Sequence, residues 1–511
     1  MKFAPTIETK TMTTDSCANS KDHYFEVTTE TKEIHRVSGV GASFTIAVSI
    51  AKGIILIVTT GILARFIPPD EFSVVALAMP LLAIATHISQ LGLAHSIAQR
   101  PSVKHYQASM LFWLSVILGS AAWICFYTIG LFAVNYFREP RISAIYFSLG
   151  AAVFFGAIYS PVLAIYWRQL RIREVQIISI LSIIISCTLA ILAGYFGASY
   201  WAVVIQQITL PLCNGVVLAL RMGWTPSAPS LPVWKEVRSF IVFGGHIAAF
   251  TLLYQLSQSL NVIIAGRNLA ATDISYYYRT WNISRLPGSL LLTPLGGTFI
   301  PALSRLSEHP ADFRTLYLKS LSRILIITVP IGLALSISAH DIVALMLGPL
   351  WLDASPLLAI FGLRVLWSAL SESFRWILSA QNQTSKLSFL GIVLTITAFI
   401  SMFVGLRYGI EGLAIAWITC EFAVLIGLSG FFVCRHSPIN HTDLLIILCE
   451  ILIYATALAF AAHLFIWIIP SDSIYLRVIT MFVAFLIVIA ARVLLQKELR
   501  NDFFSLLGIS R

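Results

Sequence analysis

The hydrophobic positions of this chain fall into long, unbroken runs that short polar stretches separate. About fourteen runs are long enough to cross a bilayer as helices, which takes roughly 20 residues each. Because the runs do not alternate with polar residues, they predict helices rather than the strands of a membrane barrel. The expected spans lie near residues 41–64, 74–98, 108–135, 143–166, 177–195, 200–220, 239–264, 275–303, 319–338, 355–378, 387–406, 411–434, 444–469 and 475–496. We therefore expect an all-α, polytopic integral membrane protein.

The composition supports a membrane protein. Hydrophobic residues make up 58% of the chain and charged residues 11%, and the mean hydropathy is +0.84. A soluble domain carries about 25% charged residues, so this chain has too few polar groups to cover its own surface. The net charge of +10 does not indicate nucleic acid as a partner, because the basic residues are scattered over short loops.

The basic residues predict the orientation of the chain. Loops after even-numbered spans carry more Lys and Arg, among them Arg168, Arg171 and Arg173, than loops after odd-numbered spans. The positive-inside rule then places both termini in the cytoplasm. Residues 1–38 lack an apolar run, which predicts a disordered cytoplasmic tail. The first apolar run is long enough to span, so we expect no cleaved signal peptide.

An internal repeat predicts two related halves. LARFIPPDEFS (63–73) ends the first span and AGRNLAATDIS (265–275) ends the seventh, and each has Arg, an acid and Ser at matching positions. Repeats of this kind build many secondary transporters. We expect two six-helix lobes and two further helices, divided as tail 1–38, first lobe 39–221, cytoplasmic linker 222–237, second lobe 238–436, and extra helices with a cytoplasmic C-terminus 437–511.

Four cations lie inside expected spans. Charges at membrane depth are costly unless they face a cavity or a partner. We predict that these residues line a cationic lumen and bind an anionic substrate: Lys52, Arg279, Arg285 and Arg364. Two alternatives stay open, namely that Arg279 reaches the membrane interface and that Arg364 pairs with Glu421. Glu372 and Arg375 are three residues apart and are expected to pair on one helix face.

Polar and aromatic side chains near these cations are candidates for contacts to sugars. Tyr277 and Trp281 flank the arginines, and Gln255, Gln258 and Asn261 recur every three residues as a polar stripe. The run of three tyrosines from Tyr276 is more typical of an aromatic belt at the membrane interface than of a sugar-binding surface. Glu421, an acid inside a span, is the candidate for ion coupling.

Motifs for other chemistries were not found. The sequence has no GxxxxGK[ST], HExxH or GxSxG pattern, which argues against an ATPase, a zinc protease or a serine hydrolase. The seven cysteines include no CxxC, which does not indicate a metal site. We expect no catalytic residues, no cofactor and no metal.

Five stretches carry a resemblance to a known family. They are GILARFIPPDEFSVVALA (61–78), LGLAHSIAQR with LFWLSVILG (91–119), YWRQLRIREV (166–175), the block from NVIIAGRNLAATDIS to IPALSRL (261–306), and YGIEGLAIAW (408–417). The chain resembles the polysaccharide-transporter family of oligosaccharide flippases, whose superfamily also holds MATE-type exporters and lipid II flippases. It looks like the colanic-acid, succinoglycan and xanthan exporter branch. Ser73 and Asn261 depart from the family pattern, which usually has glycine and often aspartate there.

The resemblance implies a V-shaped pair of lobes around a cationic lumen and the passage of undecaprenyl-pyrophosphate-linked repeat units. We therefore expect a flippase that works by alternating access. Its partners would be the lipid-linked oligosaccharide, membrane lipids, and a polymerase and co-polymerase of the same pathway. Two alternatives remain: an ion-coupled multidrug exporter, which would favour an acidic cavity, and a membrane polysaccharide polymerase or ligase, which would need a large periplasmic loop.

Overall fold

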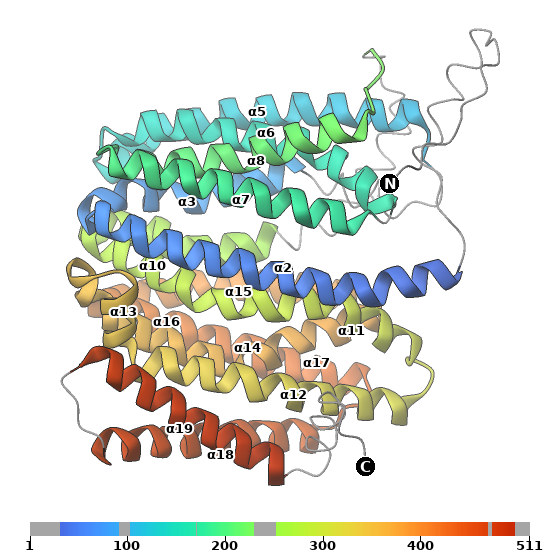
Figure 1. Cartoon of the computed structure of the whole chain (residues 1–511), viewed down its shortest axis with the longest axis vertical. Coiled ribbons are helices and arrows are strands. Elements are labelled where there is room, and N and C mark those ends of the chain that lie inside the picture. The colour runs from blue at the N-terminus through green and yellow to red at the C-terminus, as the bar shows by residue number, and fades with distance from the viewer. Residues whose placement is uncertain (1–30, 91–102, 170, 229–251, 469–472, 496–511) are drawn as a thin grey trace, which may run out of the picture.

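The computed structural model describes residues 31–90, 103–169, 171–228, 252–468 and 473–495. Over these ranges the chain forms helices and no strands, as the unbroken apolar runs predict. The long helices lie side by side and run between the same two ends of one bundle (Figure 1). We call the end with the α2–α3 turn and α13, on the left of Figure 1, end A, and the opposite end end B.

The first half of the bundle comprises the helices α2 Thr31–Phe66, α3 Pro69–Gln90, α5 His105–Phe137, α6 Ile142–Arg168, α7 Ile172–Tyr195 and α8 Trp201–Met222. Local sequence sets several of their ends. α2 stops just before Pro68 and Pro69, and Pro69 begins α3 with Asp70 and Glu71 in the first turn. Proline fits the first helical position, and acids there interact well with the helix dipole.

The second half comprises helical residues 252–268, then α10 Ala271–Pro287, η2 Gly288–Leu292, α11 Thr293–Arg305, α12 Pro310–Ile337, α13 Ala339–Met346, η3 Pro349–Ala354, α14 Ser355–Ala380, α15 Thr384–Gly405, η4 Leu406–Tyr408, α16 Gly409–Phe422, η5 Ala423–Leu428 and α17 Ser429–His436. α10 and α11 form one span that a π-helical turn, η2, widens after Pro287. Proline lacks the N–H that a regular helix needs at that point.

Twelve segments of the described residues are long and apolar enough to cross a membrane. One of them, Ser385–His436, covers two of the expected spans, and the expected span 239–264 lies partly outside the described residues. The described part of the chain is therefore all-helical and the protein is multi-pass, whereas the number of fourteen spans stays a prediction.

Some boundaries differ from expectation. α2 begins at Thr31, inside the expected tail 1–38, because no proline separates residues 31–38 from the apolar run and the helix extends outward. The rest of that tail, most of the linker 222–237 and residues 496–511 lie outside the described residues. The short helices α13 and η3 between two spans were not expected.

α3 lies in the core of the bundle. Its residues 74–78 are consecutively buried, since α3 contacts α5 and α6 on one side and α10 on the other. A helix that is apolar all round is typical of such an interior position. α3 is therefore an interior helix of the first half that packs against α10 of the second half.

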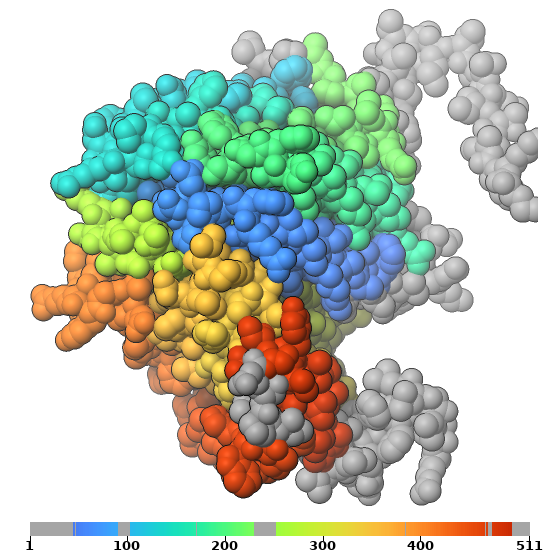
Figure 2. All heavy atoms as spheres, turned by 60° about the vertical axis from the view of Figure 1, so that its left-hand side comes forward, coloured from blue at the N-terminus to red at the C-terminus, as the bar shows by residue number. Residues whose placement is uncertain are grey.

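The two halves approach closely at end A. A Cβ atom placed on Gly61 of α2 would lie only 2.6 Å from the carbonyl oxygen of Met346 on α13. Gly348 then adopts a φ of +91°, which lets the chain turn into η3. Figure 2 brings this end forward and shows the blue atoms of α2 against yellow atoms of the second half. Glycine at position 61 thus permits backbone contact between the halves.

The last two helices, α18 His441–Ile468 and α19 Ile474–Leu495, form a hairpin beside the second half. Arg314 of α12 holds Asp443 of α18 through two hydrogen bonds of 2.6 and 2.8 Å. Arg477 of α19 holds Asp341 of α13 through two of 2.6 and 3.2 Å. These paired contacts fix the hairpin at both ends of the bundle.

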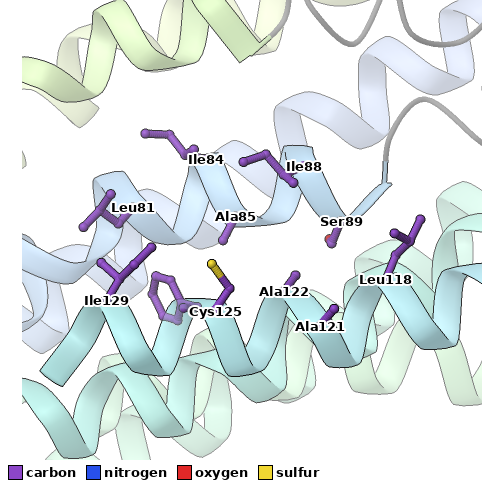
Figure 3. A pocket seen from close by; sticks show the side chains of 11 residues that line it. Leu81, Ile84, Ala85, Ile88, Ser89, Leu118, Ala121, Ala122, Cys125 and Ile129 are labelled. Carbon is purple, nitrogen blue, oxygen red and sulfur yellow. The ribbon is translucent and has the colours of Figure 1, made fainter. Parts of the chain in front are cut away.

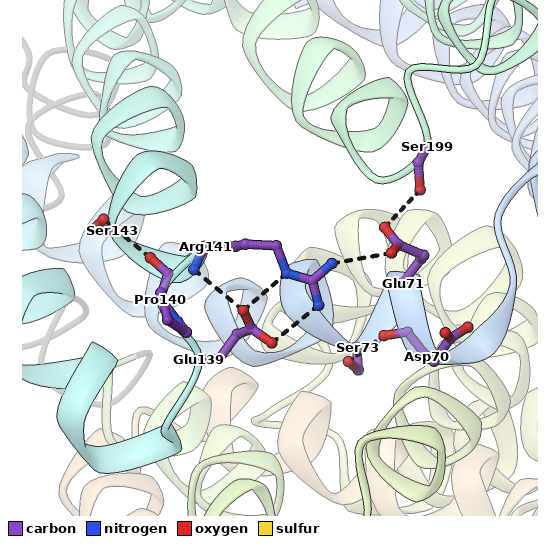
Figure 4. A network of polar contacts seen from close by, with 8 residues as sticks. All are labelled: Asp70, Glu71, Ser73, Glu139, Pro140, Arg141, Ser143 and Ser199. Carbon is purple, nitrogen blue, oxygen red and sulfur yellow. Dashed lines mark hydrogen bonds and ion pairs between the residues drawn. The ribbon is translucent and has the colours of Figure 1, made fainter.

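A polar network joins three loops of the first half at end A (Figure 4). Arg141 contacts Glu139 at 2.9 Å and Glu71 at 3.0 Å, and the Ser199 hydroxyl donates to Glu71. The hydrogen bond from Arg141 lowers the pKa of Glu139, and the same bond raises the pKa of Arg141. The network ties the start of α3 to the α5–α6 and α7–α8 turns.

Candidate functional site: a cationic cavity between the halves

A cavity of about 410 Å³ lies between the two halves. The first half contributes residues from α2, α3 and α8, and the second half contributes residues from α10, η2 and α13. Its polar lining consists of Thr60, Gln206, Gln207, Tyr278, Arg279, Asn282, Arg285 and Ser289. Among the described residues no Asp or Glu lines it. The cavity is therefore positively charged.

One face of α10 and η2 supplies much of this polar lining. Tyr278, Asn282, Arg285 and Ser289 follow one another at intervals of four, three and four residues. This spacing places them along a single stripe of a helix. The stripe leads from the contact between the halves toward the π-helical turn.

Arg285 is half-buried and lines the cavity. Its guanidinium carbon lies 5.9 Å from the centre of the Trp281 ring, within the range of a cation–π contact. No carboxylate of the described residues forms an ion pair with it. Its charge is thus available to a ligand in the cavity.

Arg279 lies deeper, at end A, and is only 8% exposed. Its guanidinium carbon lies 3.8 Å from the centre of the Phe72 ring. The nitrogens Nε and Nη2 are buried and find no hydrogen-bond acceptor among the described residues. Arg279 is therefore a second cation of the cavity without a carboxylate partner.

The other two predicted cations lie elsewhere. Lys52 Nζ donates a hydrogen bond of 2.8 Å to Gln176 Oε1, between α2 and α7. Arg364 donates to both carboxylate oxygens of Glu421, at 2.5 and 2.8 Å, and its guanidinium lies 4.8 Å from the Trp281 ring centre. Neither lines the cavity. Of the two alternatives for Arg364, the pairing with Glu421 is the arrangement that the structure has.

The predicted sugar contacts also lie outside the cavity lining. Tyr277 and Trp281 are 1% and 4% exposed, and both rings pack against Phe361. Their faces are therefore covered by protein rather than open to a ligand. Gln258 and Asn261 are buried without hydrogen bonds to other described residues.

The remaining predicted residues have local partners. Gln255 donates to Ser259 one turn away. Glu421, the ion-coupling candidate, is 1% exposed and has both oxygens bound by Arg364. Glu372 pairs with Arg375 at 3.0 Å, which confirms the predicted pair.

Sequence reasoning missed the amides of the cavity. Gln206 and Gln207 are adjacent amides inside the apolar run of α8, and Asn282 lies between the two arginines on α10. Uncharged polar groups in a span carry a smaller penalty than charges, so they stand out less. The adjacent pair of glutamines was the available signal.

A second cavity, of about 280 Å³, lies between α3 and α5 (Figure 3). Its lining is almost wholly apolar, and Ala85 of α3 points toward Cys125 of α5. It offers no charge and few hydrogen-bonding groups to a glycan or a phosphate. The cationic cavity is therefore the candidate site.

Solved structures show which fold this is. The chain aligns with a structure titled "Lipid II flippase MurJ, inward closed conformation" at a TM-score of 0.68, with 13% identity, over 89% of this chain and 99% of that one. It aligns with an inward-facing multidrug-resistance MATE family transporter of the MOP superfamily at 0.63, with 12% identity, over 77% and 98%. The chain therefore shares the fold of these two solved structures.

Sequence relatives come from several bacteria. The lipopolysaccharide biosynthesis protein WzxC of Escherichia coli (strain K12) is 24% identical over 62% of this chain, and the match spans 64% of that relative's length, less than two thirds. The teichuronic acid biosynthesis protein TuaB of Bacillus subtilis (strain 168) is 19% identical over 76% of this chain and 80% of its own length. The succinoglycan biosynthesis transport protein ExoT of Rhizobium meliloti (strain 1021) is 22% identical over 60% and 62%.

A family model described as "Polysaccharide biosynthesis protein" matches residues 62–356, more than half of the chain. The matched region contains the repeated segments and every charged residue of the cavity. The chain therefore belongs to this polysaccharide biosynthesis family of membrane proteins.

Proposed function

We propose that this protein is a flippase that carries polyprenyl-pyrophosphate-linked oligosaccharide repeat units across the bacterial inner membrane. The observation that carries the proposal is the pair Arg279 and Arg285, which line a cavity between the halves without a carboxylate partner among the described residues. A pyrophosphate group supplies the missing negative charge, and arginine binds phosphate through two parallel hydrogen bonds.

The neutral lining suits the glycan part of such a substrate. The amides of Gln206, Gln207 and Asn282 both donate and accept hydrogen bonds, as sugar hydroxyls do. The hydrocarbon tail has no polar group to place there and would stay in the lipid. The names of the relatives, which refer to lipopolysaccharide, teichuronic acid and succinoglycan, support a glycan product.

The size of the cavity supports alternating access. About 410 Å³ is near the lower end of the range for small-molecule sites, so the halves must separate to admit a whole repeat unit. We propose that α2–α8 and 252–436 are the two moving lobes, joined through the linker 222–237. End A would face the periplasm and end B the cytoplasm, because the basic loops cluster at end B, and we propose that both termini are cytoplasmic.

The cavity disfavours the alternative of a multidrug exporter. A cationic drug requires negative charge or a proton-carrying acid in its site, and the described lining has neither. Glu421 is held by Arg364 inside the second half, which disfavours ion coupling by this residue. The translocated lipid would pass to a polymerase and co-polymerase of the pathway, the partners that we expect.

The proposal is tested by complementation of a host strain that lacks this protein. The deletion strain should lose its surface polymer and accumulate lipid-linked repeat units on the cytoplasmic leaflet. Restored wild-type protein should recover export, whereas Arg279→Gln and Arg285→Gln should reduce it about thirtyfold, as expected when charge-assisted phosphate contacts are lost. Arg407→Gln, at an exposed site away from the cavity, is the matched control. Normal polymer output in the deletion strain, or full export by both arginine variants at equal protein level, would contradict the proposal.

A further inference from the structure

Arg279 lies between aromatic rings that come from opposite halves. Its guanidinium carbon is 3.8 Å from the ring centre of Phe72 in the first half and 5.6 Å from that of Trp351 in the second. The two rings are 5.8 Å apart in an edge-to-face arrangement. A cation of the second half is thus held against a ring of the first.

This environment leaves the cation incompletely satisfied. Nε and Nη2 of Arg279 are buried, and neither makes a hydrogen bond to another described residue. Buried donors without acceptors are costly, and the aromatic faces compensate only part of that cost. Arg364 shows the contrasting case, because Glu421 of its own half satisfies it through two hydrogen bonds.

The same contact lies where the halves are joined at end A. Trp351 Nε1 donates a hydrogen bond of 3.0 Å to the carbonyl oxygen of Ala64 on α2. The Ser275 hydroxyl of α10 donates to the carbonyl oxygen of Pro69 at the start of α3. Movement of Arg279 away from Phe72 would therefore remove one of the contacts that hold the two halves together at end A.

We propose that Arg279 is a latch whose release couples the binding of an anionic phosphate to the separation of the halves at end A. This inference rests on the proposed function, since it assigns the trigger to the pyrophosphate of the same substrate. Phe72, which also lines the cavity, and Trp351 are then positioning residues that act through Arg279.

The exchange of partners follows from the geometry. Because Nε and Nη2 are buried against the rings, a phosphate in the cavity gains two parallel hydrogen bonds only when the guanidinium leaves them. Two charge-assisted hydrogen bonds are stronger together than a cation–π contact, so a phosphate stabilises the guanidinium more than the rings do. A neutral glycan offers no such gain, and a ligand shifts a conformational equilibrium only through different affinities for the two states.

The latch itself is tested without ligand. Spin labels at Pro140→Cys and Leu350→Cys, both exposed at end A in opposite halves, report the distance between the halves in a chain whose native cysteines are replaced by serine, in lipid nanodiscs. Phe72→Leu and Arg279→Met should each raise the ratio of separated to closed molecules about fivefold. Arg279→Lys, which keeps a cation over the ring, should restore most of the closed population.

A matched control distinguishes the general effect of losing a buried aromatic ring from the specific effect of losing the ring that holds Arg279. Phe126 is as buried as Phe72 and stacks on Tyr146 within the first half, so Phe126→Leu should leave the distance unchanged. The double variant Phe72→Leu with Arg279→Met should open end A no further than either single change. Unchanged distances in both single variants would overturn the inference.

The trigger is tested with undecaprenyl pyrophosphate, and undecaprenol serves as the neutral probe. The pyrophosphate should widen the wild-type distance and the alcohol should not. Binding of the pyrophosphate without widening would overturn the latch and leave the proposed function standing. A failure to bind would overturn the proposed function and the trigger, while the ring variants would still show whether Arg279 closes end A.

Discussion

Trp351 and Ala64 form a hydrogen bond between the two halves: the indole Nε1 lies 3.0 Å from the carbonyl oxygen of α2. The indole is fully buried, and it comes from η3, a six-residue turn between two spans. The hydrogen bond therefore depends on η3, the short segment between α13 and α14. The Trp351 ring also contacts the Phe72 ring and the Arg279 guanidinium.

Trp351→Phe should favour separation of the halves. The change keeps an aromatic ring but removes the N–H, so the carbonyl of Ala64 loses a bond worth about 1 kcal/mol. The labelled pair at end A should report a ratio of separated to closed molecules raised about fivefold. Trp417→Phe is the control, because its buried Nε1 has no hydrogen-bond partner among the described residues. Equal effects of the two changes would show that the bond is not responsible.

Gly61→Ala should push α2 and α13 apart at end A. The added methyl group would lie 2.6 Å from the Met346 carbonyl oxygen, and backbone cannot yield as a side chain does. We expect a loss of closure at end A and export reduced at least about tenfold, since overpacking costs about 1–3 kcal/mol. Gly297→Ala, where an added Cβ meets nothing within 4 Å, should retain export. Wild-type distances and wild-type export in Gly61→Ala would contradict the close approach.

The pair Arg364 and Glu421 distinguishes a structural role from ion coupling. Glu421→Gln leaves a buried guanidinium without its counter-charge, which destabilises by about 3–5 kcal/mol. The double change Arg364→Met with Glu421→Met should recover folded protein, as measured by its thermal unfolding in detergent. Full export by the recovered double variant would exclude ion coupling at Glu421, and a stable but inactive one would support it.

Acid should weaken the network at end A of the first half. Arg141 lowers the pKa of Glu139, so the stabilisation is complete above the unfolded carboxyl pKa of about 4.3. It is lost as the pH falls through the lower pKa of the folded state. Both groups are partly exposed, which limits the effect to about 0.5 kcal/mol. The free energy of unfolding should fall between pH 6 and pH 3 by about 0.5 kcal/mol less in Arg141→Met than in the wild type. Arg407→Met should show the same fall as the wild type.

The spans were predictable because a helix that crosses a bilayer needs a long apolar run. Such a run is visible in the sequence whatever the helix packs against. The run expected at 355–378 is α14, Ser355–Ala380. The pair Glu372–Arg375 was predictable for a similar reason, since residues three apart on one helix are neighbours whatever surrounds them. α13 and η3 were missed because eight and six residues are too short to leave a periodic signal.

The faces of α10 were harder to predict. Tyr277 and Trp281 are next to residues of the cavity in sequence, yet they point into the second half against Phe361, whereas Tyr278 and Asn282 line the cavity. A helix packed on several sides has polar and aromatic residues on more than one face, so proximity along the chain does not indicate which face meets the ligand. The same holds for Lys52 of α2, whose position in a span did not indicate that its face meets Gln176 of α7.

The hairpin α18–α19 has a consequence for how the bundle would move in a bilayer. It contacts α12, α13, α14 and α17, and ion pairs at its two ends attach it to the second half. It also carries large exposed apolar residues such as Leu445, Ile453 and Phe482. The second half together with this hairpin thus has a larger lipid-facing surface than the first half. The viscous drag of the surrounding lipid on the second half is therefore greater. Relative to the membrane plane, we expect the smaller first half to perform most of the rotation.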